Sequence, residues 1–342
     1  MKKLIALALT LMMVFSAVSA LAEGVKIGIV TPDADHGFTG ESVAHARAEA
    51  EALKAAGVIE DYMMGVGNEA AKQIERLDEI IAWGPDAIVL WPIEGDQLRN
   101  EAQKIVDEKI PLIIYDRLIE NFKGMSGEIM GDNVAIGNQM GEYLLKFYEE
   151  DLKAGKTITY LLFIGDASTV SKQRTQGMLD ILDASEYKDQ FKLLQDGFQT
   201  DWSNAKSQEF MENWLTTASS EDIKELDLIV THDDEIVDGI MTVIRDDAAL
   251  ENLRLITSVG GRRETLAIFD AVEKPALVTY FFSPSMVREA IRLGVAAAKG
   301  EEYAGQKIEG QIFLIPTIEI DKESKAEYEK SQDYIDRYSI AD

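Results

Sequence analysis

The amino-acid sequence predicts an α/β protein made of two similar halves, each with a doubly wound parallel sheet. Apolar runs of strand length alternate with amphipathic helical segments from Val25 onwards. The runs are continuously apolar, which is typical of parallel strands covered by helices on both faces. A chain of 342 residues also suffices for about two domains. A polar turn at 153–156 marks the point where the second set of elements begins.

Residues 1–22 precede these elements and have the pattern of a secretory signal peptide. Lys2 and Lys3 come before an apolar stretch from Leu4 to Val18, and 20–22 form a small-x-small cleavage site. The stretch is shorter than the ~20 residues of a membrane span. We therefore expect an exported, cleaved protein. The sequence has no cysteine that could carry a lipid anchor, so we expect it to be retained in a periplasm, with secretion as the alternative.

The first half begins with a strand at 25–30 and a helix from Gly40 to Ala56, which Gly57 ends. The further predicted elements of this half are helices at 70–83 and 97–108 and strands at 86–91 and 111–115. The second half has predicted strands at 157–164, 191–196, 226–231, 255–259 and 276–281, with helices at 168–184, 203–217, 234–247 and 262–272. This alternation predicts right-handed βαβ units.

Ligands of open parallel sheets bind beyond the carboxyl ends of the strands, so the residues that follow each strand are informative. Aromatic side chains and paired polar groups dominate these positions, which suits a polyhydroxylated ligand. The positions are 33–38, Trp91, 116–117, 166–174, 200–202, 232–233 and 258–263.

Composition and motifs argue against several other functions. A formal net charge of -27 disfavours binding to nucleic acid or to anionic lipid. The sequence has no Gly-x-Ser-x-Gly elbow, no His-Glu-x-x-His helix and no Walker phosphate loop. The three histidines are His36, His45 and His232, and His45 is expected on the solvated side of its helix. We therefore expect no catalysis, no metal and no cofactor.

Several segments together resemble the periplasmic sugar-binding proteins of ABC transporters, in their ribose, galactose and xylose branch. The resemblance spans about 25–320 and rests on no single motif. Its most specific segment is 110–117, Ile-Pro-Leu-Ile-Ile-Tyr-Asp-Arg. The other matching segments are 27–30 followed by Phe38, 86–92, 131–133, Arg174 with Gly177, 201–202 and 232–235.

The resemblance implies two lobes joined by a three-crossing hinge, with a sugar enclosed between them when they close. The N-terminal lobe would comprise 25–131 plus 284–312. The C-terminal lobe would comprise 133–281 plus 315–342. The partners it implies are a monosaccharide, an ABC permease and a possible chemoreceptor, and the protein is expected to be a monomer without a nucleic-acid partner.

The same resemblance assigns polar ligand contacts to residues of both lobes. Asp116 and Arg117 would bind sugar hydroxyls, the carboxylate as acceptor and the guanidinium as a rigid donor. Arg174 would donate from the second lobe. Asp233 matches an amide or carboxylate ligand of relatives, although an N-cap of the following helix is a second reading.

Aromatic residues complete the expected site. Phe38 and Trp202 would cover the apolar faces of the sugar ring. His36 and Trp91 stand where relatives place polar ligands, and Phe282 matches a polar hinge position of ribose-type relatives.

Two alternatives to a neutral-sugar carrier remain open on the sequence. Where relatives commonly have an aspartate, this chain has Gly260, followed by Arg262 and Arg263. The added cations suggest a sugar acid or another anionic ligand as an alternative cargo. The second alternative is a periplasmic sugar sensor that feeds a membrane signalling receptor.

Overall fold

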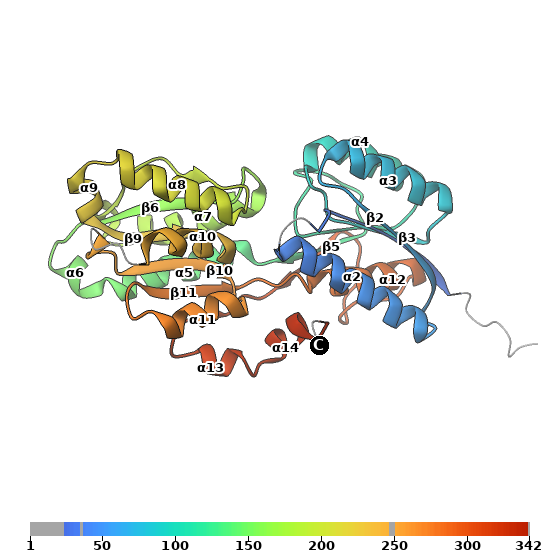
Figure 1. Cartoon of the computed structure of the whole chain (residues 1–342). Coiled ribbons are helices and arrows are strands. Elements are labelled where there is room, and N and C mark those ends of the chain that lie inside the picture. Colours follow the sequence, from blue (N-terminus) through green and yellow to red (C-terminus); the bar gives the residue numbers. More distant parts are fainter. Residues whose placement is uncertain (1–23, 35–36, 246–249, 341–342) are drawn as a thin grey trace, which may run out of the picture.

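Two β-sheets, each covered by helices, form the two lobes of the molecule (Figure 1). The computed structural model describes residues 24–34, 37–245 and 250–340. The signal-peptide prediction for 1–22 therefore lies outside the described residues. Within the described ranges, no helix combines the length and the apolar character that crossing a membrane requires.

The first sheet has six parallel strands in the order β12-β5-β4-β3-β1-β2. Its strands are β1 (Val25–Thr31), β2 (Ile59–Val66), β3 (Ala87–Leu90), β4 (Leu112–Tyr115), β5 (Gly127–Gly131) and β12 (Gln311–Ile315). Its helices are α2 (Gly37–Ala55), α3 (Ala70–Trp83), α4 (Gly95–Asp107) and α12 (Met286–Lys299). Helices α3 and α4 share one apolar core with the sheet, and α2 and α12 share another.

The second sheet follows the order β13-β11-β10-β9-β6-β7, and β8 pairs with β6. Only the short β13 is antiparallel among its described pairs. Its strands are β6 (Ile158–Ile164), β7 (Phe191–Leu193), β8 (Phe198–Gln199), β9 (Leu226–Thr231), β10 (Leu255–Gly260), β11 (Ala276–Phe281) and β13 (Glu319–Ile320).

Helices cover this second sheet on both faces as well. One face carries α5 (Asn133–Phe147), α6 (Glu149–Lys153) and α7 (Thr169–Ala184). The other face carries α8 (Asn204–Thr217), α10 (Asp234–Ile244) and α11 (Arg263–Ala271). Two short segments, a 3-10 turn (Lys188–Gln190) and α9 (Ser220–Glu225), complete this half.

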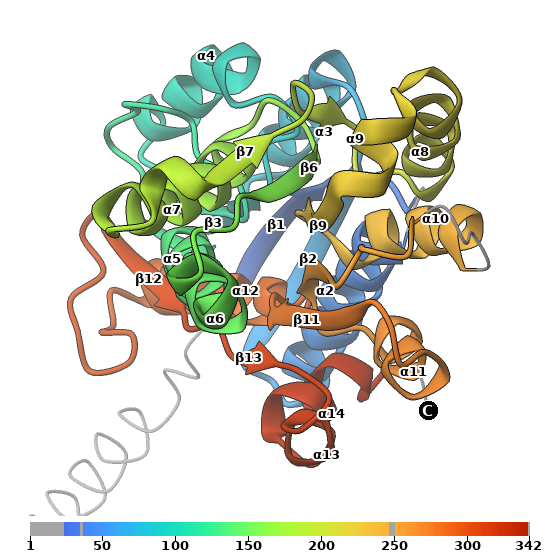
Figure 2. The ribbon, with the colours of Figure 1, turned by 90° about the vertical axis from the view of Figure 1, so that its left-hand side faces the viewer.

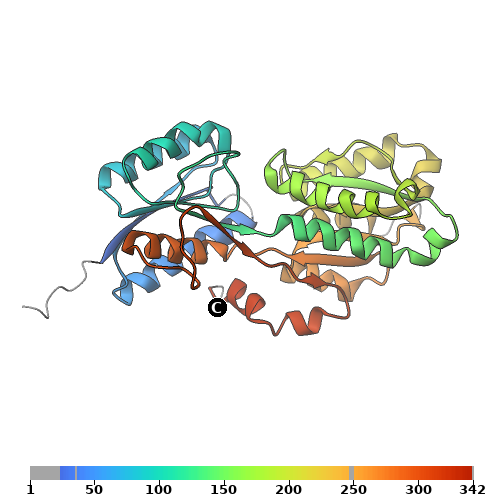
Figure 3. The ribbon, with the colours of Figure 1, turned by 180° about the vertical axis from the view of Figure 1, so that it is seen from behind.

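Three stretches of chain run between the two sheets (Figure 3). They connect β5 to α5, β11 to α12 and β12 to β13. Backbone hydrogen bonds tie the stretches together, because the Asp132 amide donates to the Ile315 carbonyl at 3.1 Å and the Phe281 amide donates to the Ile318 carbonyl at 2.8 Å. The lobes are thus joined by a narrow, hydrogen-bonded ribbon.

The predicted fold class is confirmed, and most predicted elements lie within a few residues of those in the structure. Strands β2, β5, β12 and β13 and helix α12 were missed. Strand β2 is an edge strand whose middle is half-buried, so it lacks the continuous apolar run that marks the central strands. The predicted strand at 191–196 is in fact the short β7, followed by β8 after a break.

The C-terminal helices α13 (Lys325–Tyr328) and α14 (Gln332–Tyr338) lie beyond β13 (Figure 2) and correct the expectation for His45. That side chain is fully buried, because α14 covers it and the Arg337 carbonyl lies 2.8 Å from its Nε2. Burial, with the nearby Arg288 cation, lowers the pKa of His45 to about 4. The solvated surface position expected for His45 was therefore wrong.

Candidate functional site

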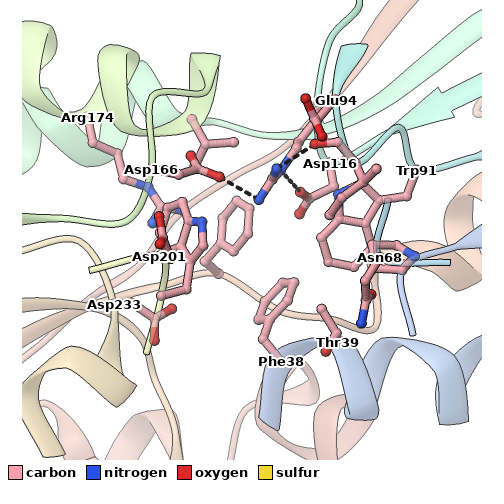
Figure 4. Close-up of a pocket in the computed structure, with 16 residues that line it drawn as sticks. Phe38, Thr39, Asn68, Trp91, Glu94, Asp116, Asp166, Arg174, Asp201 and Asp233 are labelled. Atoms are coloured by element: carbon pink, nitrogen blue, oxygen red, sulfur yellow. Dashed lines mark hydrogen bonds and ion pairs between the residues drawn. The ribbon is translucent and has the colours of Figure 1, made fainter. Parts of the chain in front are cut away.

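A cavity of about 500 Å³ lies between the two lobes, at the carboxyl ends of the central strands of both sheets. Figure 4 shows Phe38, Asn68, Trp91 and Asp116 on one side of it, opposite the acidic and basic side chains of the second lobe. The lining residues are Pro32, Phe38, Thr39, Asn68, Trp91, Ile93, Glu94, Asp116, Arg117, Asp166, Val170, Arg174, Asp201, Trp202, Asp233 and Phe282.

The structure brings eight of the nine predicted ligand-binding residues to this one cavity. They are Phe38, Trp91, Asp116, Arg117, Arg174, Trp202, Asp233 and Phe282. The ninth, His36, lies outside the described residues. Their contact with a ligand stays a prediction.

Three aromatic rings from the first lobe and the hinge pack together along the cavity. Phe38, near the start of α2, stacks on Phe282 with ring centroids 5.5 Å apart and planes at 25°. It also meets Trp91 edge to face at 5.8 Å. Because these rings support one another, they form a fixed apolar wall suited to the C–H face of a flat ligand.

Missing Cβ atoms make room for two of the aromatic side chains. A Cβ on Gly131, at the end of β5, would lie 2.2 Å from the Phe282 ring, and one on Gly165, after β6, would lie 2.2 Å from the Trp202 ring. Asp201 and Trp202 also have positive φ angles of 49° and 60°. The chain thus accepts unfavourable backbone conformations to place Trp202 at the cavity.

Asp116 and Arg117 follow β4 and line the cavity with contrasting contacts. Asp116 is 4% exposed, and within the described residues its carboxylate accepts no hydrogen bond. Burial raises the pKa of Asp116 to about 6, although the Arg117 and Arg174 cations oppose this shift. The Arg117 guanidinium donates to the Ile93 carbonyl at 2.8 Å. Its Nε lies 3.9 Å from an Asp116 oxygen.

Arg174, on α7, is 1% exposed and is held from several sides. It donates to Asn133 Oδ1 at 2.9 Å and to the His232 carbonyl at 2.5 Å. Its guanidinium carbon lies 4.5 Å from the Phe282 ring centroid. Burial lowers the pKa of Arg174 to about 10, which leaves it charged at neutral pH. This cation is therefore pre-positioned at the hinge side of the cavity.

Asp233 is the N-cap of α10 and a lining residue at once. Its carboxylate accepts a hydrogen bond from the Glu235 amide at 2.8 Å, so the N-cap reading is confirmed. Burial and the neighbouring carboxylates of Glu235 and Asp234 raise the pKa of Asp233 to about 8. At neutral pH this group can donate as well as accept.

Sequence reasoning missed several lining residues, for different reasons. Asn68 comes shortly after β2, the strand that was not recognised, so the strand-end rule could not be applied to it. Asp166 and Asp201 lay inside segments noted as following strands but were not singled out. Asp166 forms an ion pair with Arg117 at 2.9 Å and thereby joins the two lobes across the cavity.

The two arginines that suggested an anionic ligand do not line the cavity. Arg262 lies 3.3 Å from Asp238 and 3.7 Å from Glu235, so carboxylates of α10 surround it. Arg263 covers the Tyr338 ring at 3.8 Å. The sequence argument for an anionic ligand placed these two cations near the ligand, and this placement is wrong.

Metal binding finds no support in the described ranges, where no three His, Asp or Glu side chains are grouped to hold an ion. Several buried donors of cavity residues lack hydrogen-bond acceptors among the described residues instead. They are Trp91 Nε1, Arg117 Nε and Arg174 Nη2. A ligand with oxygen acceptors would satisfy those that face the cavity.

Comparison with known proteins agrees with this architecture. The putative rhizopine-binding protein of Rhizobium meliloti is 22% identical over 269 residues, which cover 77% of this chain and 80% of that protein. The D-xylose-binding periplasmic protein of Haemophilus influenzae is 21% identical and covers 76% of this chain and 75% of its own length.

Solved structures show the same fold. An ABC transporter solute-binding protein of Bacillus halodurans, with bound myo-inositol, superposes with a TM-score of 0.75 at 17% identity. The match covers 91% of this chain and 99% of that one. The family profile of the periplasmic binding protein domain matches residues 27–302. This chain therefore belongs to the periplasmic binding protein family.

Proposed function

We propose that this protein is an exported solute-binding protein that captures a monosaccharide between its closing lobes and delivers it to an ABC permease. The observation that carries the proposal is the cavity between the lobes, with aromatic rings and charged hydrogen-bonding groups converging on it from both sides. Such a cavity buries a small ligand almost completely, as recognition by a carrier requires.

The chemistry of the lining groups matches hydroxyl groups in particular. A hydroxyl donates one hydrogen bond and accepts others, so it needs acceptors and donors close together. Asp116 and Asp233 offer carboxylate oxygens, while Arg174 offers a buried donor without a protein acceptor. The rings of Phe38 and Trp202 offer apolar surfaces to the C–H groups of a pyranose or a cyclic polyol.

Transport, rather than catalysis, is the activity we assign to this site. The three-stretch connection between the sheets provides a hinge about which the lobes can close and open. Relatives are described as binding proteins for D-xylose and for galactofuranose, which supports a sugar as the cargo. We place the mature chain in the periplasm on the strength of its N-terminal signal pattern and its family.

Ligand titration of the mature chain, residues 23–342, tests this proposal. Because Trp91 and Trp202 line the cavity, neutral pentoses, hexoses and cyclitols can be screened by intrinsic fluorescence and then titrated calorimetrically. We expect one or a few of them to bind with a Kd of about 1 μM or tighter. NMR of the recovered ligand should show it unchanged.

Two tryptophan variants localise the binding. Trp202→Ala should weaken binding at least about thirtyfold, since buried aromatic anchors carry much of the affinity at such sites. Trp83→Ala is the matched control, because Trp83 ends α3 beneath Lys26 and does not line the cavity. The proposed function would be overturned if no neutral sugar or polyol bound to the protein, or if the two variants lost equal amounts of binding affinity.

A further inference from the structure

The ion pair between Arg117 and Asp166 lies in the lining of the cavity between the lobes and engages the Arg117 guanidinium. Arg117 follows β4 of the first sheet, and Asp166 follows β6 of the second. Their charged atoms are 2.9 Å apart, and both side chains are largely buried. A second nitrogen of Arg117 donates to the Ile93 carbonyl at 2.8 Å. In Figure 4 a dashed line runs from Asp166 towards the side of the cavity that carries Asp116.

Two adjoining cavities meet at this pair. The inner one holds the aromatic rings described above. The outer one, of about 490 Å³, has no aromatic residue in its lining and continues along α4 and α7. Both are lined by Ile93, Glu94, Arg117 and Asp166. A ligand in the inner cavity therefore meets the ion pair from the side of Asp116.

The charges around the inner cavity are unbalanced in favour of acids. Its lining has five carboxylates and two guanidinium groups among the described residues. Burial disfavours the charged form of Asp166, but Arg117 and hydrogen bonding from Ser168 and Trp202 outweigh it and lower the pKa of Asp166. Asp166 is therefore an anion at neutral pH, and it neutralises one of the two guanidinium groups that could otherwise receive an anionic ligand.

We propose that Asp166 is a specificity-determining residue, which excludes sugar acids by occupying the guanidinium of Arg117 from the opposite lobe. This inference rests on the proposed function and narrows its ligand class to neutral sugars and polyols. A uronate carboxylate could pair with Arg117 Nη2 only by displacing Asp166. The displaced carboxylate would then be left partly buried without its cation, beside a second anion, which is strongly unfavourable.

Matched pairs of ligands and variants test the inference. Each neutral sugar is titrated beside its uronic acid. The first pair is D-glucose with D-glucuronate, and the second is D-galactose with D-galacturonate. The wild-type protein should bind the neutral member about a hundredfold or more tightly than the acid. Asp166→Asn should reduce this preference at least about tenfold by releasing Arg117. Asp166→Ala provides a second variant without the amide.

Asp201→Asn is the control, because it makes the same chemical change in the same cavity. Asp201 is half-exposed and pairs with Lys206, so its loss should alter the preference less than about threefold. Asparagine also tolerates the positive φ of this position. The control therefore separates the Arg117 pair from the general effect of removing one negative charge.

The outcomes separate the inference from the proposed function. Wild-type binding of a uronate as tightly as its neutral partner overturns the inference alone. The same holds if both Asp166 variants keep the wild-type preference, or if Asp201→Asn changes it equally. If no neutral sugar and no acid binds the wild-type protein, the proposed function fails and the inference fails with it.

Discussion

Arg337 links three parts of the molecule, and its replacement by methionine should destabilise the whole fold. The side chain is 1% exposed. Its Nε donates to Glu41 Oε2 of α2 at 3.1 Å, and Nη1 donates to the Gly260 carbonyl at 2.6 Å. Nη1 also lies 3.5 Å from the carbonyl of Phe282, in the hinge. Methionine fills similar volume but leaves these acceptors unsatisfied.

The magnitude follows from the number and burial of these contacts. Hydrogen bonds to charged groups contribute about 1.5–3 kcal/mol each, and breaking a buried ion pair costs about 3–5 kcal/mol. Glu41 remains partly exposed, so we expect a loss of about 3 kcal/mol for Arg337→Met. With an unfolding entropy of about 2.1 cal/mol/K per residue over about 320 residues, Tm should fall by about 4–5 °C.

Calorimetric unfolding of the ligand-free protein measures this loss directly. Arg76→Met is the matched control, because Arg76 also bonds to glutamates but does so on the exposed face of α3. Its Tm should change by less than about 1 °C, since exposed ion pairs contribute little. Equal shifts for the two variants would refute the reasoning that α14 holds the lobes and hinge together through Arg337.

Three further perturbations test other parts of the structure. Burial raises the pKa of Glu128 to about 7, so the wild-type protein loses stability as pH rises from about 4.5 to 7. In urea unfolding, Glu128→Gln should be about 1–3 kcal/mol more stable than the wild type at pH 8 and no more stable than it at pH 4. Gly165→Ala places a methyl group in the Trp202 ring and should weaken sugar binding at least about tenfold by calorimetry. Gly40→Ala should not, because its Cβ would meet only the Ala34 side chain, at 3.9 Å. His45 in the folded protein stays neutral down to a pH of about 4, so the free energy of unfolding should fall as the pH is lowered from 6.5. His45→Gln should reduce this dependence of stability on pH, and an unchanged dependence would contradict the burial of His45.

The repeating pattern of the sheets could be predicted because each central strand is buried on both faces. Strands such as β3 and β4 are continuous apolar runs, and their ends are therefore visible in the sequence. The rule that ligands bind at carboxyl ends of strands then selects side chains far apart in sequence, such as Asp116 and Arg174, for one cavity. Local pattern and topology are enough for this step.

The rest depends on tertiary contacts that no local pattern encodes. His45 lies on the polar side of its own helix, yet a helix almost 300 residues later buries it. Arg262 directly follows a strand end, but the carboxylates of α10 draw its guanidinium away from the cavity. Asn68 could not be found because its strand, β2, lies at a sheet edge.

Three of the six non-glycine residues that have positive φ angles in the described part of the chain line the cavity where the ligand is expected. Asp116, Asp201 and Trp202 all have positive φ angles, which carry a steric penalty for residues with a side chain. The Asp116 carboxylate is also buried without a hydrogen-bond partner in the described part of the chain. Each feature alone would destabilise the fold, so their convergence on one cavity indicates that the lobes are shaped for a bound molecule. A hydroxyl-rich neutral ligand provides what Asp116 lacks without competing for the Arg117–Asp166 pair.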